Sequence, residues 1–183
     1  MVLRVLGGSL RGSMLAAPAD TAFRPTSARR RQAVFDILRA QYPSFAGLVF
    51  ADVFAGTGAV GFEALSEGFA EVVFVENDPA AAGLVRRNAK ALGVGDRVTL
   101  LQNDATRLGP ARTRVDVAFL DPPYGQKLAE TALRRLLEGG WLHPGSVVLV
   151  ELGKTDPFAP PAGLDVARTY RHGAGHLVRL HPT

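Results

Sequence analysis

The sequence contains no cysteine and no apolar run long enough to cross a membrane. Without cysteine there can be no disulfide, no thiolate metal site and no enzyme that activates a pyrimidine carbon through a cysteine adduct. The four histidines lack the spacing of a metal site, so we expect no bound metal. The first twenty residues also lack the apolar core of a signal peptide. We therefore expect a cytoplasmic protein, whose 183 residues, 47% of them hydrophobic, can bury a sizeable core.

Positive charge is concentrated near the amino terminus. Residues 1–40 contain seven arginines and two aspartates, a net charge of +5, although the whole chain carries only +4. Arg29, Arg30 and Arg31 fall at the start of a predicted helix, where cations oppose the helix dipole. Phosphates would offset this cost, so we expect these three arginines to contact nucleic acid. A solvated arginine cluster without a ligand is the alternative interpretation.

Strand and helix patterns alternate along most of the chain. The predicted strands span residues 48–52, 72–76, 98–101, 115–120, 146–151, 164–170 and 176–180, and the predicted helices span residues 27–42, 59–68, 79–92 and 127–138. This order predicts an α/β fold with a mostly parallel seven-stranded sheet and an antiparallel hairpin at its carboxyl end. We expect residues 1–42 to form a basic extension, with a small hairpin and one helix, and residues 43–183 to form the main domain.

A glycine-rich loop follows the first predicted strand of the sheet. Gly56, Gly58 and Gly61 match the dinucleotide pattern G-x-G-x-x-G, so the glycines alone do not say which adenosine cofactor binds. Asp52 at the end of the strand would repel a pyrophosphate, but it suits the ammonium and sulfonium charges of S-adenosylmethionine. The sequence therefore favours the cationic cofactor.

Acidic residues also end the next two strands. Glu76 follows one apolar run, where its carboxylate can accept both ribose hydroxyls, and Asp104 follows the other. Ligands of open α/β sheets bind at the carboxyl ends of the strands, so Asp52, Glu76 and Asp104 outline one adenosine site. Capping of the following helix is the alternative for each acid, and it is our interpretation of Asp78, which precedes Pro79.

The tetrapeptide Asp121-Pro122-Pro123-Tyr124 ends the apolar run 115–120. The two prolines remove two backbone donors and leave carbonyl oxygens and the Asp121 carboxylate as acceptors, beside the aromatic ring of Tyr124. Acceptors that hold the hydrogens of an exocyclic amine favour a more pyramidal, attacking nitrogen. We therefore predict a pocket for a flat, amine-bearing group, with a proline-rich loop that merely ends the strand as the alternative.

The chain resembles the methyltransferases that modify N2 of guanine 966 in bacterial 16S ribosomal RNA. The resemblance extends over nearly the whole length and is carried by residues 52–61, Glu76, Asp104, residues 121–124 and Phe23-Arg24-Pro25-Thr26. It implies a Rossmann-like class I methyltransferase, S-adenosylmethionine as the donor and residues 121–124 as the target-base pocket. The family often has Glu and then Phe-Asn in the first helix, where this chain has Gln32 to Asp36.

We predict an enzyme that methylates N2 of a guanine in 16S ribosomal RNA, either free or in an assembling small subunit, and that works as a monomer. One carboxylate can accept both N1–H and N2–H of guanine, whereas adenine better suits an amide. Methylation of adenine N6 or of a protein glutamine amide is the first alternative. A nicotinamide-dependent oxidoreductase and a non-catalytic nucleic-acid-binding module are the alternatives from other classes.

We expect Asn88, amid basic residues on the helix 79–92, to be solvated.

Three groups of residues carry the functional predictions. The predicted catalytic residues are Asp121, Pro122 and Tyr124, and the predicted RNA-binding residues are Arg24, Arg29, Arg30 and Arg31. The predicted cofactor-binding residues are Asp52, Phe54, Gly56, Gly58, Gly61, Glu76 and Asp104.

Overall fold

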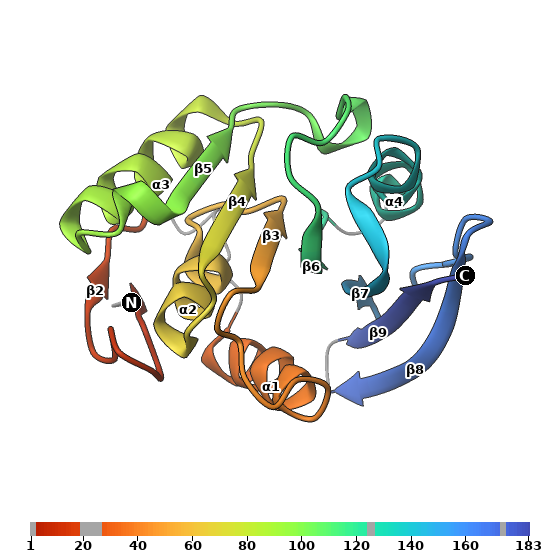
Figure 1. The fold of residues 1–183 in the computed structure, drawn as a ribbon, viewed down its shortest axis with the longest axis horizontal. Coiled ribbons are helices and arrows are strands. Elements are labelled where there is room, and N and C mark those ends of the chain that lie inside the picture. The colour runs from red at the N-terminus through yellow and green to blue at the C-terminus, as the bar shows by residue number, and fades with distance from the viewer. Residues whose placement is uncertain (1–2, 19–26, 124–126, 173–174) are drawn as a thin grey trace.

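A computed structural model of the chain describes residues 3–18, 27–123, 127–172 and 175–183 (Figure 1). Its seven-stranded sheet has the order β5-β4-β3-β6-β7-β9-β8. The strands are β3 (Val49–Val53), β4 (Glu71–Val75), β5 (Val98–Leu101), β6 (Val115–Leu120), β7 (Leu142–Gly153), β8 (Leu164–His172) and β9 (Gly175–Pro182). Strands β3 to β7 are parallel to one another, whereas β9 is antiparallel to both β7 and β8. The predicted mostly parallel sheet with an antiparallel final hairpin is confirmed.

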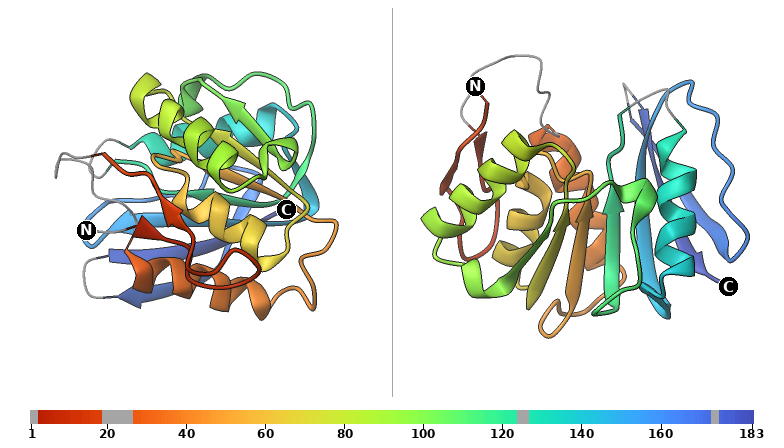
Figure 2. Two further views of the ribbon diagram at one scale, coloured as in Figure 1. Left: turned by 90° about the vertical axis from the view of Figure 1, so that its left-hand side faces the viewer. Right: turned by 90° about the horizontal axis from the view of Figure 1, so that it is seen from above.

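Helices cover both faces of this sheet (Figure 2). They are α1 (Ala28–Arg39), α2 (Ala59–Glu67), α3 (Pro79–Ala91) and α4 (Leu128–Glu138), with 3₁₀ turns η1 (Gly95–Arg97) and η2 (Ala105–Arg107). Apolar side chains of α1, α2 and α3 share one core with the sheet, and those of α4 share a second core on its opposite face. A two-stranded sheet, β1 (Leu3–Arg4) and β2 (Met14–Leu15), joins the first core through Leu3 and Leu15.

Local capping signals define the starts of two helices, and the cap at Asp78 is the one predicted above. The Ser27 hydroxyl accepts a hydrogen bond from the Arg30 backbone N–H at 3.4 Å, and the Asp78 carboxylate accepts one from Ala81 at 2.8 Å, with Pro79 in the first helical position. Two predicted boundaries differ most from the observed ones. Helix α1 ends at Arg39 rather than at residue 42. Strand β7 begins at Leu142 rather than at residue 146, because it pairs with β6 across an irregularity near Val115.

The path of the chain through the sheet determines where a ligand can bind. The chain moves outward from β3 to β4 and β5, then returns to β6 on the other side of β3. The strand order therefore reverses between β3 and β6, and open α/β sheets bind their ligands outside the carboxyl ends of the strands at such a point. Asp52 in β3 and Asp121 directly after β6 lie at this point.

Candidate active site

Four carboxylates lie in a row at the carboxyl ends of neighbouring strands. Strand alternation places a side chain on the same face as the residue two positions earlier. The residues two positions before the four acids all belong to the core shared with α1, α2 and α3: Phe74, Phe50, Phe119 and Leu149. The acids therefore point to that face, in sheet order Glu76, Asp52, Asp121 and Glu151. Such a concentration of negative charge suits a cationic ligand.

Asp52 is buried, with 2% of its surface exposed. Its Oδ2 accepts a hydrogen bond at 2.8 Å from the backbone N–H of Gly61, in the first turn of α2. Burial raises the pKa of the Asp52 carboxyl to about 8; the Gly61 hydrogen bond opposes this rise, and the Asp121 and Glu76 carboxylates add to it. A cation beside Asp52 would compensate for these costs of ionisation, so the residue fits the positively charged part of S-adenosylmethionine.

The glycine-rich loop connects β3 to α2 in conformations that few side chains adopt. Phe54, Gly56 and Gly58 have φ values of 64°, 55° and 77°, and Phe54 is strained there because it carries a side chain. A Cβ atom on Gly61 would lie 2.2 Å from the Phe74 ring, so this glycine is required for close packing of α2 on the sheet. The predicted glycines thus shape the loop, and Gly61 also presents its N–H to Asp52.

Glu76 joins this loop to the end of β4. Its Oε2 accepts a hydrogen bond from the Gly56 N–H at 2.7 Å, and its Oε1 accepts one from the Asp78 N–H at 2.8 Å. Each carboxylate oxygen retains a further acceptor site, which a ribose hydroxyl can use. The side chain is therefore held in place by the backbone of the loop that follows Asp52.

Asp104 follows β5 and caps the short turn η2. Its Oδ1 accepts from the N–H of Thr106 at 2.8 Å and from the Thr106 hydroxyl at 2.7 Å. These two hydrogen bonds lower the pKa of Asp104, so it stays ionised at neutral pH. The capping role considered from the sequence is present, and a cofactor contact by Asp104 stays a prediction.

Asp121 lies between the cofactor loop and β7. Its backbone N–H donates to the Val53 carbonyl at 3.3 Å, its side chain is half-buried, and Pro122 after it is buried. The electrostatic influence of Asp121 reaches both Asp52 and Glu151, whose pKa values it raises. The structure thus brings Asp121 next to the predicted cofactor site, while Tyr124 lies outside the described residues.

Comparisons with known proteins identify the family to which the chain belongs. The family model described as "Conserved hypothetical protein 95" matches residues 3–180. "Ribosomal RNA small subunit methyltransferase D" of Haemophilus influenzae is 32% identical over 163 residues, which cover 87% of this chain and 83% of the relative. The chain belongs to this family. Its enzyme class, an S-adenosylmethionine-dependent methyltransferase, and its cofactor are therefore those predicted, and the nicotinamide alternative is set aside.

Solved structures show the same fold. A hypothetical protein from Thermus thermophilus superimposes with a TM-score of 0.75 at 38% identity, and each chain is covered completely. An RNA methyltransferase from Salinibacter ruber, solved in complex with S-adenosyl-L-homocysteine, gives a TM-score of 0.66 over 87% of this chain and 94% of that one. At 21% identity this second likeness concerns the fold alone. The predicted class I methyltransferase fold is confirmed.

The three neighbouring arginines of α1 have different environments. Arg29 is exposed, Arg30 is partly buried with its Nε 3.4 Å from Oε1 of Glu151, and Arg31 is only 2% exposed. Arg31 donates to the Arg4 carbonyl at 2.9 Å and lies 3.8 Å from Glu63, and burial lowers its pKa. Arg31 is therefore not placed to contact a phosphate, and that part of the prediction was wrong.

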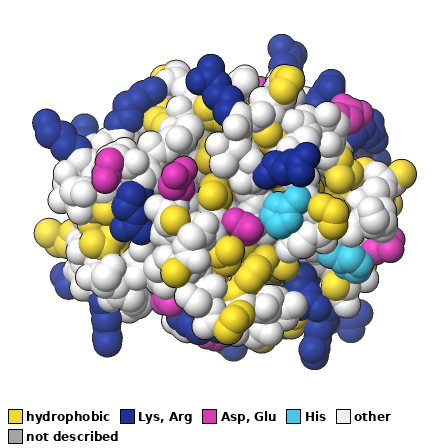
Figure 3. All heavy atoms as spheres, viewed as in Figure 1, with side chains coloured by type: hydrophobic (Ala, Val, Ile, Leu, Met, Phe, Trp, Pro, Cys, Tyr) yellow, Lys and Arg dark blue, Asp and Glu magenta, His cyan; other side chains and the backbone are white. Residues whose placement is uncertain are grey.

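The basic side chains are not gathered into one patch on the face drawn in Figure 3. Lys and Arg side chains are instead spread around the molecule in this view. Arg24, the remaining arginine predicted to bind RNA, lies outside the described residues. Of the four predicted RNA contacts, Arg29 is therefore the one that the described structure leaves on the surface.

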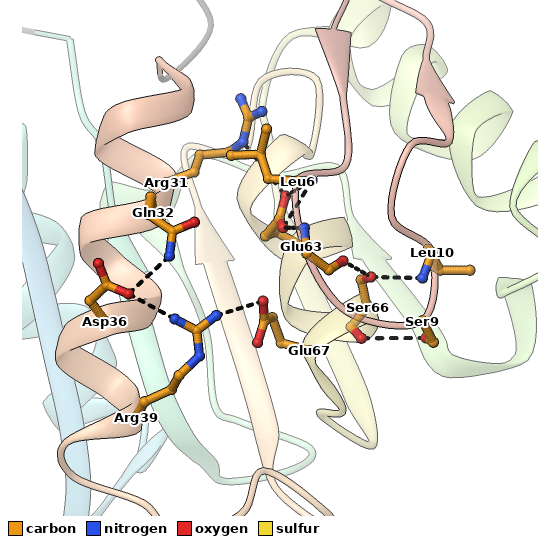
Figure 4. Close-up of polar contacts among 11 residues, drawn as sticks. Leu6, Ser9, Leu10, Arg31, Gln32, Asp36, Arg39, Glu63, Ser66 and Glu67 are labelled. Atoms are coloured by element: carbon orange, nitrogen blue, oxygen red, sulfur yellow. Dashed lines mark hydrogen bonds and ion pairs between the residues drawn. The ribbon is translucent and has the colours of Figure 1, made fainter.

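A polar network that sequence patterns did not predict attaches the amino-terminal segment and α1 to α2 (Figure 4). Glu63 of α2 accepts hydrogen bonds from the N–H groups of Leu6 and Gly7, at distances of 2.6–3.0 Å. Ser66, one turn later, accepts from the Leu10 N–H at 2.8 Å. Both polar side chains are buried, although they occur in a helix otherwise rich in apolar residues. Their place within an apolar helix was the sequence signal for such a contact.

Asn88 has a related function, and the prediction that it is solvated was wrong. It is 1% exposed, its Oδ1 accepts from the Ala16 N–H at 2.7 Å, and its Nδ2 donates to the carbonyls of Ala16 and Thr57. Thr57 belongs to the glycine-rich loop, so one side chain joins the amino-terminal segment to the cofactor site. The position of Asn88 beside Val85 and Ala89, both buried, was the sequence signal for its burial.

Clusters of metal ligands and membrane-spanning helices are both absent from the described residues. Within them, no three His, Asp or Glu side chains are grouped as ligands of one ion. None of the helices in the described ranges is long and apolar enough to span a bilayer.

Proposed function

We propose that this enzyme transfers a methyl group from S-adenosylmethionine to the exocyclic N2 of a guanine in 16S ribosomal RNA. The observation that carries the proposal is the position of Asp121, beside Asp52 where the strand order reverses. One carboxylate there can accept both N1–H and N2–H of guanine, which present two donors side by side. The names of the relatives, which specify the small ribosomal subunit, support the choice of RNA.

The residues of the cofactor site have separate roles in this proposal. When bound, S-adenosylmethionine supplies a methyl group on a positively charged sulfur. Asp52 offers a buried carboxylate to the cationic part of the cofactor, and Glu76 accepts from the ribose hydroxyls. Asp104 contacts the adenosine at the end of β5. The loop is shaped by Phe54, Gly56, Gly58 and Gly61.

The transfer step requires a nitrogen lone pair that points at the methyl carbon. The N2 lone pair forms the new N–C bond, the C–S bond breaks with its electrons remaining on sulfur, and N2 loses one proton. Asp121 and the carbonyl oxygens beside Pro122 hold the N2 hydrogens and stabilise the charge that develops on nitrogen. The proton leaves N2 along its hydrogen bond to Asp121. Tyr124 stacks on the base after it rotates out of the RNA.

We propose that the amino-terminal region binds the RNA. Residues 1–42 act as an extension of the domain formed by residues 43–183, with Arg24 and Arg29 contacting the RNA. This division into extension and domain is one of function and not of structure, because α1 packs into the same hydrophobic core as the sheet. A monomer in the cytoplasm, acting on 16S ribosomal RNA or on an assembling small subunit, completes the proposal.

The test is tritiated methyl transfer to 16S ribosomal RNA, offered free and in particles from a strain without the enzyme, followed by nucleoside analysis. Asp121→Asn should retain cofactor binding and lose most transfer, because an amide brings its own donors to the acceptor site. Asp96→Asn is the matched control, since exposed Asp96 precedes β5 at the opposite edge of the sheet. N6-methyladenosine as the product, or full activity of Asp121→Asn, would overturn the proposal.

A further inference from the structure

Glu151 is a buried acid in an otherwise apolar part of β7. Only 2% of it is exposed, although Val148, Leu149 and Val150 before it and Leu152 after it are core residues. Val150 pairs with Leu120 in the parallel β6–β7 ladder, so Glu151 and Asp121 are the next residues along the two adjacent strands. A buried carboxylate is costly unless another group compensates for it. Glu151 lies beside Asp121, whose carboxylate accepts the guanine amine in the proposed function, and this position suggests a role for Glu151 in the reaction.

Arg30 provides a compensating charge from α1. Its Nε lies 3.4 Å from Oε1 of Glu151, and 17% of the Arg30 side chain is exposed. Burial raises the pKa of Glu151 to about 7, Asp121 adds to this rise, and Arg30 opposes it. Asp121 and Arg30 are thus two charged groups that affect Glu151. The ionisation of Glu151 therefore depends on Asp121 on one side and on α1 on the other.

Anchoring of α1 is the simpler explanation for this ion pair. Helix α1 has other anchors, however: Arg31 is near Glu63, and Arg39 reaches Glu67 at 2.7 Å (Figure 4). Neither of these pairs lies beside Asp121. The Arg30–Glu151 pair differs from them by its electrostatic contact with the group that holds the reacting amine.

We propose that Glu151, held by Arg30, is a positioning residue for methyl transfer that acts through Asp121. Neighbouring carboxylates disfavour each other's ionisation, and Asp121 must be an anion to accept two N–H groups. Glu151 forms the ion pair with Arg30. It thereby prevents Arg30 from pairing with Asp121 and drawing the Asp121 carboxylate away from the base. Arg30 in turn limits the repulsion between Glu151 and Asp121. This inference rests on the proposed function, because it takes Asp121 as the acceptor of the guanine amine.

The test compares kcat, KM and the pH–rate profile of Glu151→Gln, Arg30→Gln and the double variant. Glu151→Gln should lower kcat about tenfold or more, because Arg30 then competes for Asp121, with little change in cofactor affinity or KM for RNA. Arg30→Gln should move the rising limb of the pH profile to higher pH, because Glu151 and Asp121 lose their cation. The double variant should lose much less than the product of the two single losses.

Arg39→Gln is the matched control, because it breaks an α1–α2 ion pair away from Asp121. It should reproduce any loss of thermal stability while kcat and the pH profile stay at wild-type values. Arg30→Lys keeps the positive charge, so it should retain part of the activity that Arg30→Gln loses. This comparison tests the ion pair even if Glu151→Gln folds poorly. The salt dependence of RNA affinity should be the same for Arg30→Gln and wild type, since this arginine is assigned to Glu151 and not to a phosphate.

Two failures can be told apart. If the wild-type enzyme forms no N2-methylguanosine, the proposed function is wrong. If it does, and Glu151→Gln and Arg30→Gln match it in kcat and pH profile, or their losses simply multiply, then the pair only anchors α1 and the inference is wrong.

Discussion

Cofactor binding should release a proton from Asp52. In the cofactor-free enzyme the pKa of this buried carboxyl is about 8, and a positive charge beside it should lower that pKa. With a pKa of about 8, roughly 0.9 of the molecules hold the proton at pH 7, about half at pH 8 and roughly 0.1 at pH 9. The number of protons released should therefore fall from about 0.9 to about 0.1 over this range. The contribution of Asp52 to the affinity, taken as the difference between wild type and Asp52→Asn, should rise with pH up to about 8 and then level off.

Calorimetry measures this release directly. Titration with S-adenosylmethionine in buffers of different ionisation enthalpy gives the number of protons as the slope of the observed heat. The α-amino group of the ligand titrates near pH 8 as well, so the informative quantity is the difference between wild type and Asp52→Asn. Asparagine keeps an oxygen that can accept the Gly61 hydrogen bond, but it cannot ionise. Equal proton release by the two proteins would refute the assignment of Asp52 to the cationic part of the cofactor.

The remaining predictions concern RNA binding, the amino-terminal contacts and the target base. Arg29→Gln should flatten the plot of log RNA affinity against log salt by about 0.7 to 0.9, whereas Arg31→Gln should instead lower the melting temperature, because it leaves Glu63 buried without its cation. An unchanged salt slope for Arg29→Gln would make that arginine simple surface charge. Asn88→Ala should destabilise the protein by about 1 to 3 kcal/mol, measured by urea unfolding, because buried backbone groups of Ala16 and Thr57 lose their partner. Tyr124→Ala should lower turnover roughly ten- to a hundredfold and Tyr124→Phe far less, as stacking is worth about 1 to 3 kcal/mol per base; equal losses would indicate a role for the hydroxyl.

The elements that were predicted well depend on short stretches of chain. The capping signals of Ser27 and Asp78 act within one helical turn, and apolar runs identify buried strands wherever they pair. The sequence analysis could predict that the acids after the strands lie close together, because parallel strands end at one edge of a sheet. The positions of Asp52 and Glu76 followed from these rules.

The errors concern side chains whose environment depends on distant segments. Arg29, Arg30 and Arg31 are consecutive and chemically identical, yet a helix turns about 100° per residue, so they face solvent, the end of β7 and α2 respectively. Asn88 looked like a polar surface residue because its partners, Ala16 and Thr57, come from other parts of the chain. No local pattern identifies these distant partners.

The sequence by itself therefore determined the α/β order, the glycine-rich loop, the acids at the strand ends and the Asp121–Tyr124 motif, since each is written in contiguous residues. Only the tertiary structure decided which of Arg29, Arg30 and Arg31 is exposed, and only it placed Glu151 beside Asp121. The physical reason is that burial and electrostatic coupling belong to pairs of groups. Their strength depends on distance and local dielectric, which exist only after α1 and the sheet have packed together.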